Sequence, residues 1–518
     1  MFKKLITNPR LLIVISAVLS ALPFTFSGMF FVSWVSFVPL FYVMIKQNGN
    51  KLRQAFGYGF LFGLIYHICV YYWFVWFYPL DYAGLDDATS LILVCLAVFG
   101  ISLAHGALWC IPFIVCFFVK KINKSPLFLS FAAILSIIFA QKITLLSELS
   151  FPWVRVSLGQ YTATPLIQAA SLFGIDGVDM IILAVNALIA VCIISPPKKR
   201  VFAAVGAIAI FVTNLGFGII RINTAHNGEP FTVMAVQASV SQEEKWSADG
   251  DVICFDAHSA LTKDNLTEDV DLVIWPESAV PTVYKSYKSL KKYKALSQEI
   301  DTPILAGILL KSNKKHTNNA TLITKDGVIA NYSKRHLVPF GEHVPYEPIL
   351  TKIFPFLGQI NVLSEDYIAG TSSEIMTING GKVGNIICFE SIYPEISRTT
   401  TLDGAQLLIE TTNDSWLEDS PAMTQHLAHG VFRSVENGRF LVRGANSGIS
   451  AVIDTRGKVK NMLPVDYCGT LTDTVYFCDE TTLYTKTGDI LFPICCTCFT
   501  ILTIVLFIIK IKNKKSAK

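Results

Sequence analysis

Long apolar runs separated by short polar connections fill the first 220 residues, and then the chain changes character. A membrane-spanning helix needs roughly 20 apolar residues. Runs of about this length lie at 11–26, 29–46, 57–79, 90–118, 126–146, 177–196, 201–220 and 489–509. The pattern predicts seven spanning helices in the first part of the chain and an eighth near its carboxyl end.

Residues 222–487 are of mixed polarity, with no run long enough to span a bilayer. Short β-rich stretches such as FTVMAVQA, DLVIWPES and KVGNIICFE alternate with stretches of helical character, among them 285–299 and 421–438. This alternation is typical of an α/β domain. We therefore predict a membrane domain at 1–221, an α/β domain at 222–487, and an eighth helix with a basic tail at 488–518.

Charge in the connections predicts the orientation. Lys and Arg cluster in alternate connections and near both ends of the chain, whereas the connection after the third run carries Asp81, Asp86 and Asp87. By the positive-inside rule, both ends are expected in the cytoplasm and the α/β domain on the outer side. No small-residue cleavage site separates the first run from the second, so we expect a retained anchor rather than a signal peptide.

Composition narrows the class of protein. The chain has 518 residues, of which 52% are apolar, and a net charge of +4. No block of Lys and Arg with interleaved aromatic residues is present, so a nucleic-acid partner is not expected. The twelve cysteines form no metal-binding pattern, and we expect neither metal nor cofactor. Cys468 and Cys478 would lie outside the cytoplasm, where either a disulfide or two free thiols is possible.

Two motifs in the α/β domain place charged residues after apolar strands. In DLVIWPES, Glu277 follows a strand that should be buried, and desolvation there would make it a better base. In NYSKRHLVPFGEHVP, Lys334 at a hairpin end could face a developing oxyanion, and the bend before Glu342 could return this carboxylate to the same pocket. Taken alone, a rim glutamate and a solvated surface lysine remain open alternatives.

The third motif, GNIICFESIYPE, ends an apolar strand at Cys388. A helix should start at this point, and its N-terminus together with a nearby cation would stabilise a thiolate. Taken alone, an inert buried cysteine is an equal alternative.

The order Glu277, Lys334, Cys388 resembles that of the nitrilase, or carbon–nitrogen hydrolase, superfamily. Downstream motifs agree, namely NDSW at 413–416 and NSG at 446–448. This resemblance covers about residues 230–460. It implies an αββα sandwich, with Glu277 as general base, Lys334 at the oxyanion and Cys388 as the acylated nucleophile.

Three further stretches, FPWVRVSLGQY, PLIQAASLFGIDGVDMIILAVNALIA and VQASVSQEEKW, resemble the apolipoprotein N-acyltransferase family. That family has seven spans, a periplasmic nitrilase-like domain and one final span. By motif match, the resemblance implies supporting roles for Trp246, Glu342 and Glu390. Phe389 stands where the family often has Tyr, so a role of a phenolic hydroxyl at this position is in doubt, whereas packing of the ring is not.

The resemblance also implies an activity and a location. A phospholipid would acylate Cys388, and the resulting thioester would pass its acyl chain to the amino group of a diacylglyceryl-cysteine on an apolipoprotein. This two-step reaction is the last step of bacterial lipoprotein maturation. We expect a monomer in the bacterial inner membrane, in contact with the lipid bilayer and with its catalytic domain in the periplasm.

Other functions predict other features. A membrane-anchored amidase would share the three residues, but it would not need eight spans. A transporter would show broken helices in corresponding halves. The aromatic run at 71–79 could line a lipid entrance, although an ordinary aromatic belt is favoured. For His67, His105 and Asn186, hydrogen bonds between helices are favoured over a proton path.

Overall fold

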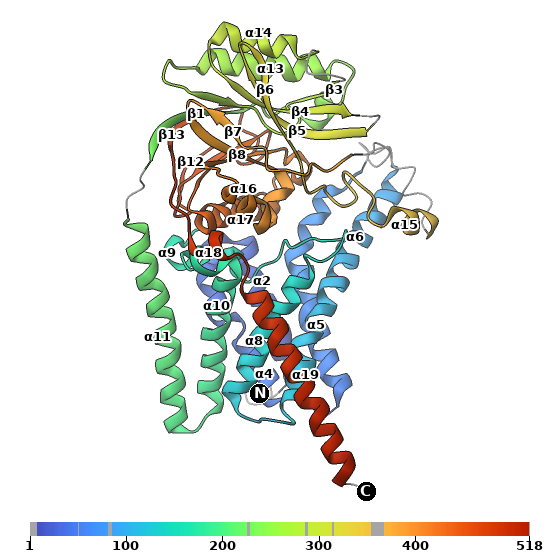
Figure 1. Ribbon diagram of the computed structural model, residues 1–518. Helices are drawn as coiled ribbons and strands as arrows, with labels where there is room; N and C mark the ends of the chain where they lie inside the picture. Colours follow the sequence, from blue (N-terminus) through green and yellow to red (C-terminus); the bar gives the residue numbers. More distant parts are fainter. Residues whose placement is uncertain are drawn as a thin grey trace.

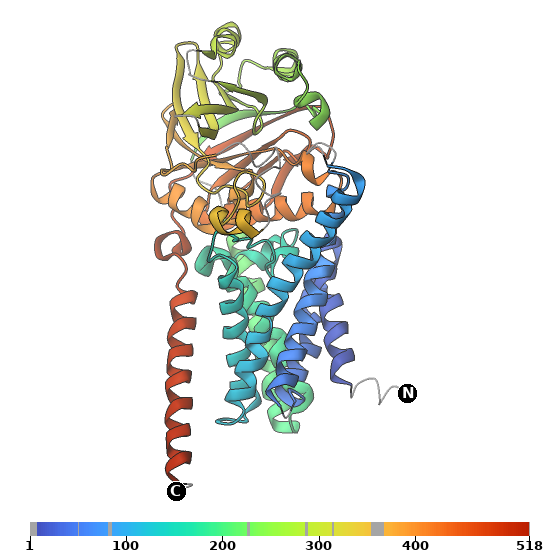
Figure 2. The same ribbon diagram turned by 90° about the vertical axis from the view of Figure 1, so that its right-hand side faces the viewer.

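The computed structural model describes residues 8–49, 51–80, 85–224, 228–284, 289–312, 315–353 and 367–516. It consists of a bundle of helices and, on one end of this bundle, a globular part built around two β-sheets (Figures 1 and 2). This arrangement confirms the two-part fold predicted from the apolar pattern.

The bundle contains the long apolar runs. Its helices are α2 (Pro9–Thr25), α3 (Ser33–Ser36), α4 (Val38–Lys46), α5 (Leu52–Tyr71), α6 (Asp87–Leu108), α7 (Cys110–Val119), α8 (Pro126–Ile143), α9 (Thr164–Ile167), α10 (Ala170–Ile194), α11 (Pro197–Ile222) and α19 (Leu491–Ser516). The start of α2 and the end of α19 lie at the end of the bundle away from the sheets (Figure 2). Helices α5 and α6 cross so closely that a side chain at Gly63 would meet the carbonyl oxygen of Gly106 at 2.3 Å, a small-residue contact common between membrane helices.

The number of spans differs from the prediction. In the described residues, six helical stretches are long and apolar enough to cross a membrane: Ser27–Lys46, Leu52–Phe77, Asp87–Val119, Pro126–Ile143, Ala170–Ile194 and Pro197–Ile222. The runs predicted as first and eighth spans form shorter apolar helices, Pro9–Thr25 and Leu491–Val505. All eight runs are therefore helical, while the count of eight spans stays a prediction.

The globular part contains thirteen strands in its described residues. They are β1 (Glu229–Gln237), β2 (Leu272–Ile274), β3 (Val280–Tyr284), β4 (Ile304–Ser312), β5 (Lys315–Thr324), β6 (Gly327–Ser333), β7 (Met376–Ile378), β8 (Gly381–Ile387), β9 (Leu407–Thr412), β10 (Phe440–Ala445), β11 (Ala451–Ile453), β12 (Val459–Met462) and β13 (Gly469–Phe477). The first sheet has the order β13-β1-β2-β4-β5-β6 with β3 beside β4, and the second has the order β12-β11-β10-β9-β8-β7.

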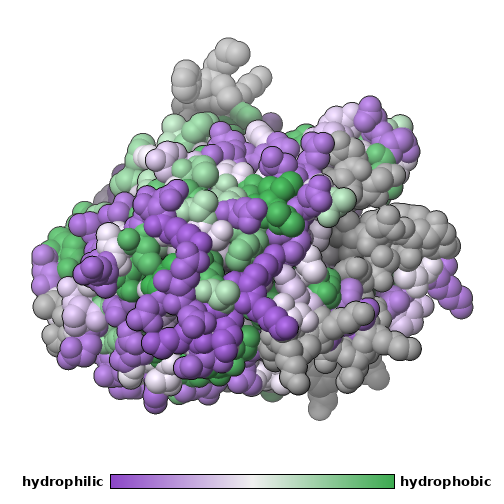
Figure 3. Space-filling view, turned by 90° about the horizontal axis from the view of Figure 1, so that it is seen from above, coloured by the Kyte–Doolittle hydropathy of each residue, from purple (hydrophilic) through white to green (hydrophobic). Residues whose placement is uncertain are grey.

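The globular part also contains seven α-helices in its described residues. They are α12 (Gln242–Lys245), α13 (Gly250–Asn265), α14 (Lys291–Ile300), α15 (Glu347–Ile353), α16 (Pro394–Leu402), α17 (Pro421–Asn437) and α18 (Leu483–Thr487). α13 and α14 lie over the first sheet, and α16 and α17 lie between the second sheet and the bundle (Figure 1). Apolar residues from both sheets form one core between them, which gives the expected αββα layers. The face turned away from the bundle is mainly hydrophilic (Figure 3).

The helical stretches expected at 421–438 and 285–299 correspond to α17 and α14, although residues 285–288 lie outside the described residues. Residues 422–437 of α17 are buried on all sides of the helix, except for the half-buried Thr424. One side of the helix faces the second sheet, and another packs against α10 of the bundle. α17 therefore joins the two parts of the molecule.

Candidate active site

Strand direction brings the three candidate residues together. β1, β2 and β4 run parallel in the first sheet, as do β8, β9 and β10 in the second. Glu277 comes shortly after β2, and Cys388 comes directly after β8. Lys334 follows β6, whose last residues pair with β5 beside Asn318. Loops from both sheets thus meet over one small region.

Glu277 is almost completely buried, with 6% of its surface exposed. Its Oε1 accepts hydrogen bonds from the Asn318 amide at 2.7 Å and from the Lys334 ammonium at 3.1 Å, and its Oε2 accepts one from the main-chain N–H of Asn413 at 3.0 Å. Gly307 on β4 lies against this loop, since a Cβ there would come within 2.6 Å of the Cα of Glu277. The carboxylate therefore has a fixed position and several donors.

Lys334 lies between two carboxylates. Its Nζ is 3.1 Å from Oε1 of Glu277 and 3.0 Å from Oε1 of Glu342. Burial opposes the charge of this ammonium, but the two carboxylates outweigh burial and hold the pKa of Lys334 well above its usual value. Lys334 is therefore a permanent cation at neutral pH. Glu342 is brought into the same cluster, as the bend before it predicted.

Cys388 has a strained backbone, with φ at +51°. This left-handed conformation is uncommon for any residue except glycine and is frequent at functional sites. It turns the chain sharply from β8 into a short 3₁₀ helix, η8 (Cys388–Ile392). The side chain is partly exposed, as access to a reactive thiol requires.

The surroundings of Cys388 affect the pKa of its thiol. Burial and the nearby charge of Glu277 raise the pKa of the thiol well above its usual value, and Lys334 offsets this only in part. The 3₁₀ turn and Lys334 therefore do not bring the pKa of this thiol below its usual value. The thiol is therefore protonated at neutral pH and needs a base. Of the two carboxylates whose charges act on it, Asp414 is paired with Arg443, so Glu277 is the better candidate for this base.

Glu390 holds the cysteine loop and the lysine loop together. Its Oε1 accepts hydrogen bonds from the main-chain N–H groups of Arg335 at 2.6 Å and His336 at 3.1 Å. Its Oε2 accepts one from the N–H of Ile387 at 2.7 Å and one from the Tyr332 hydroxyl at 2.8 Å. The side chain is fully buried and touches the residues next to Cys388 and Lys334. It can therefore position both loops.

A second buried polar cluster supports the cysteine from the other side. His426 on α17 lies with Nε2 3.1 Å from the carbonyl oxygen of Cys388 and with Nδ1 2.9 Å from Oδ1 of Asp414. Arg443 pairs with the carboxylates of Asp414 and Glu410. The side chains of Cys388, Asp414 and His426 offer ligand atoms within 4.8 Å of one another. Because Arg443 already supplies the positive charge there, the absence of a metal stays our prediction.

Phe389 connects the site to the bundle. Its ring stacks on Phe151, with 5.6 Å between ring centroids, and meets Tyr393 edge-on at 5.5 Å. Phe151 also stacks on Trp153, which in turn packs against Trp73 of the aromatic run at 71–79. Part of that run is therefore packed under the active site rather than forming a simple interfacial belt.

Trp246 is not brought to the other candidates by any contact among the described residues. Its side chain is 51% exposed, and its Nε1 donates to Gln242 at 2.8 Å. Its neighbour Lys245, by contrast, is buried and donates to the main-chain oxygen of Glu277 at 3.4 Å. Cys468 and Cys478 are both free thiols, the first exposed and the second buried.

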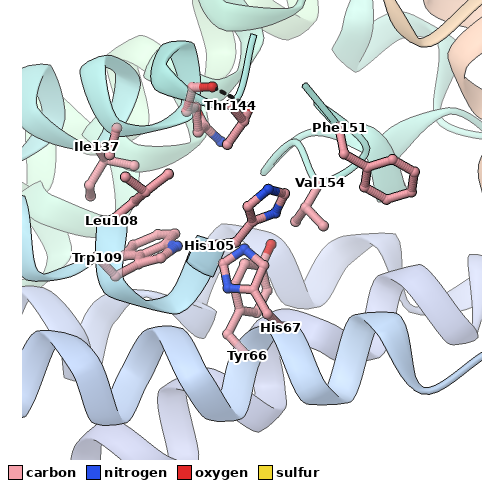
Figure 4. A pocket seen from close by; sticks show the side chains of 11 residues that line it. Tyr66, His67, His105, Leu108, Trp109, Ile137, Thr144, Phe151 and Val154 are labelled. Carbon is pink, nitrogen blue, oxygen red and sulfur yellow. Dashed lines mark hydrogen bonds between the residues drawn. The ribbon is translucent and has the colours of Figure 1, made fainter. Parts of the chain in front are cut away.

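A small cavity lies inside the bundle, between α5, α6 and α8 (Figure 4). Its volume is about 20 Å³, room for roughly one water molecule. The rings of His67 and His105 meet edge-on at its wall, with 5.5 Å between their centroids (Figure 4). His105 hydrogen-bonds the Tyr71 hydroxyl at 2.9 Å, and Asn186 bonds the main chain of Ser33 and Phe37, as expected for polar contacts between helices.

Several residues of the site were missed by sequence reasoning. Asn318 contacts both Glu277 and Glu342, but it lies in the largely polar strand β5, so its amide does not stand out in the sequence. Lys245 precedes the highlighted Trp246 and gave no signal of burial. His426 and Arg443 lie outside the motifs quoted above, and their contacts depend on pairing between distant segments.

Known families match both parts of the chain. Residues 232–476 match the family described as carbon–nitrogen hydrolase, and residues 16–188 match the apolipoprotein N-acyltransferase N-terminal domain. The apolipoprotein N-acyltransferase of Geobacter metallireducens is 29% identical over 93% of this chain and 92% of its own length. That of Allorhizobium ampelinum is 30% identical over 87% of this chain and 86% of its own. That of Methylococcus capsulatus is 28% identical over 90% of each.

Proposed function

Since this chain belongs to the apolipoprotein N-acyltransferase family, we propose that it transfers an acyl chain from a phospholipid to an apolipoprotein. The acceptor is the N-terminal amino group of its S-diacylglyceryl-cysteine, and the reaction is the last step of bacterial lipoprotein maturation. The observation that carries the proposal is the shared hydrogen bonding of Glu277 and Lys334 beside the strained Cys388, on top of apolar helices.

In the first half-reaction, Glu277 takes the proton of the Cys388 thiol, and the sulfur attacks the ester carbonyl carbon of the phospholipid. Lys334 stabilises the negative charge on the carbonyl oxygen in the tetrahedral intermediate. Glu277 then returns the proton to the departing glycerol oxygen. A lyso-phospholipid leaves, and a thioester remains on Cys388.

In the second half-reaction, the neutral amino group of the apolipoprotein attacks the thioester carbonyl carbon. Glu277 accepts the proton that the amine loses and returns it to the sulfur as the carbon–sulfur bond breaks. An amide forms, and the thiol is restored. The same base and the same oxyanion contact therefore serve both steps. Because the first product leaves before the amine attacks the thioester, the reaction is of the ping-pong type.

The supporting residues have different tasks in this proposal. Glu342 fixes the ammonium of Lys334, and Glu390 holds the loops of both Lys334 and Cys388. Phe389 packs on Phe151 of the bundle and thereby fixes the position of the cysteine loop. Trp246, exposed beside the buried Lys245, is free to contact a substrate.

We further propose a division into a membrane domain at 1–221, a catalytic domain at 222–487 and a last helix with its tail at 488–518. The protein is a monomer of the bacterial inner membrane, with both ends in the cytoplasm and the catalytic domain in the periplasm. The basic connections at alternate loops support this orientation. Lipid tails can then stay in the bilayer while their ester reaches Cys388.

Intact-protein mass spectrometry tests the proposal. After incubation with a phospholipid of known acyl chains, we expect a single acyl adduct that hydroxylamine removes and that maps to Cys388. A diacylated lipopeptide added afterwards should take the acyl chain. The variant Cys388→Ala should form no adduct, while Cys468→Ala, which removes an exposed thiol, should behave like the parent. Ammonia release from small amides without phospholipid consumption would instead identify a hydrolase.

A further inference from the structure

A larger cavity, of about 410 Å³, lies at the junction of the bundle and the sheets on the side of α11. Gly228, Gly438, Arg456, Asp479 and Glu480 contribute to its wall, and it shares no residue with the Cys388 site. Its size falls within the roughly 300–1,000 Å³ typical of small-molecule sites. The cavity can therefore hold a ligand that the acyl transfer does not use.

Two arginines at this junction have unfilled hydrogen-bonding capacity. Arg456 is 4% exposed, and its Nε has no hydrogen-bond partner among the described residues. Arg221, in the last turn of α11, has a buried Nη2 that likewise lacks a partner in the described part of the chain. Gln168 keeps the arginines close, because it accepts from Nε of Arg221 at 3.2 Å and donates to the main-chain oxygen of Arg456 at 2.8 Å.

A buried guanidinium with unused donors is costly, and a phosphate is the group whose geometry suits it best. The carboxylate of Glu480 does not fill this need. Its Oε2 is 3.9 Å from Nη2 of Arg456, which is too far for a hydrogen bond, and its side chain is 71% exposed. Asp479 beside it is exposed as well. The wall of the cavity thus holds the buried Arg456 and the exposed carboxylates of Asp479 and Glu480, and Gln168 links Arg221 to the main chain of Arg456.

The helix that carries Arg221 has an apolar surface. α11 presents exposed Val205, Ile208, Val212, Ile219 and Ile220 along its length, and Ile220 is 73% exposed. Ile219 and Ile220 immediately precede Arg221. A ligand with a phosphate, a positive group and long hydrocarbon tails would match the arginines, the carboxylates and the helix face at the same time.

We propose that this cavity binds the headgroup of a zwitterionic phospholipid of the phosphatidylethanolamine type. Its phosphate contacts Arg456 and Arg221, its ammonium contacts Glu480 and Asp479, and its tails lie along α11. This lipid is retained rather than consumed, since the cavity lies apart from Cys388. It joins the outer end of α11 to the loops that follow β11 and β13.

The test counts lipids by native mass spectrometry of the full chain released from nanodiscs of equal parts phosphatidylethanolamine and phosphatidylglycerol. The parent is Cys388→Ala, so that bound lipid is not turned over and the result does not depend on the proposed reaction. We expect Arg456→Gln to weaken retention of one phosphatidylethanolamine about tenfold, since it removes a charged hydrogen-bonding group. Lys458→Gln removes an exposed charge two residues away and should keep the lipid.

A second variant tests the proposal independently of whether Arg456→Gln folds correctly. The Glu480 side chain is exposed, so Glu480→Gln should fold normally and should lower the preference for phosphatidylethanolamine over phosphatidylglycerol roughly to parity. Equal retention by Arg456→Gln and Lys458→Gln overturns the proposal, as does an unchanged preference in Glu480→Gln. If inorganic phosphate alone displaces the lipid from the parent at millimolar concentration, the cavity is a free-anion site and the proposal is also wrong.

Discussion

The ammonium of Lys334 lies 3.1 Å from the same carboxylate oxygen of Glu277 that accepts the Asn318 amide. The group that is proposed to stabilise the oxyanion therefore also holds the proposed base. Removing Glu277 leaves Lys334 paired with Glu342, and removing Lys334 takes from Glu277 its ammonium donor.

Lys334→Met should slow both half-reactions. Loss of one oxyanion contact typically costs roughly 3–4 kcal/mol, and here it also leaves the carboxylates of Glu277 and Glu342 without their shared cation. We expect thioester formation and amide formation each to fall about 10²–10³-fold, measured by quenched-flow mass spectrometry. Lys325→Met, on the turn of the preceding hairpin, should have no effect. A loss in only one step would contradict the assigned role.

Glu277→Gln should affect two reactions of Cys388 in opposite directions. Acylation by phospholipid needs a base and should fall about 10²–10⁴-fold. The negative charge of Glu277 helps to raise the pKa of the thiol, so its removal should increase the thiolate fraction and speed alkylation by iodoacetamide. Peptide mapping gives both rates, with exposed Cys468 as internal reference. Slower alkylation in the variant would argue against this electrostatic coupling.

Glu390→Gln should lower the turnover rate with little change in KM. In the parent, both carboxylate oxygens of Glu390 accept hydrogen bonds, three of them from main-chain N–H groups. Glutamine replaces one of these oxygens by an NH₂ group, so at least one main-chain N–H then faces another donor. We expect a loss of about 1–3 kcal/mol in unfolding free energy. Glu395→Gln, at an exposed surface pair with Arg398, is the matched control. A pure KM effect would show that Glu390 contacts substrate instead.

Phe389 and Phe151 should be energetically coupled. Their rings stack between the cysteine loop and the bundle, and such pairs contribute about 0.5–1.5 kcal/mol beyond the area that they bury. A double-mutant cycle with Phe389→Leu and Phe151→Leu, followed by thermal unfolding in detergent, measures this term. Additive losses would mean that the rings stabilise the fold independently.

Lys245 should give the protein a pH-dependent stability. Burial lowers the pKa of this lysine from 10.5 to about 8. Between these pH values the unfolded chain binds more protons than the folded chain, so the free energy of unfolding rises with pH. Below about pH 8 the lysine is charged in both states, and burial of its charge destabilises the fold. Lys245→Met should be more stable than the parent at pH 7, and the difference should shrink by about 3 kcal/mol towards pH 10.5.

The comparison uses denaturant unfolding in micelles at several pH values. Lys263→Met, which removes a partly exposed lysine on α13, is the control and should leave the pH dependence unchanged. A constant difference between Lys245→Met and the parent would mean that Lys245 stays charged in the folded state.

The sequence predicted the features that local pattern determines. Glu277, Lys334 and Cys388 each follow a recognisable strand, whereas their assembly into one site was expected from the resemblance to the nitrilase superfamily. Which of burial and the nearby cation dominates the pKa of Cys388 depends on packing around the 3₁₀ turn that follows it, and burial raises that pKa. Burial of Lys245 and the contacts of Asn318 and His426 depend on which segments pair across the two sheets, and no local spacing encodes that.

The sequence predicted that α17 is a helix, but it did not predict which parts of the molecule this helix packs against. Nearly all of its residues are buried, with one side against the second sheet and another against α10. A soluble fragment cut at the end of α11 would present this face to water and would aggregate. The catalytic half cannot be produced as a free-standing hydrolase on a removable anchor, since the membrane helices complete its hydrophobic interior.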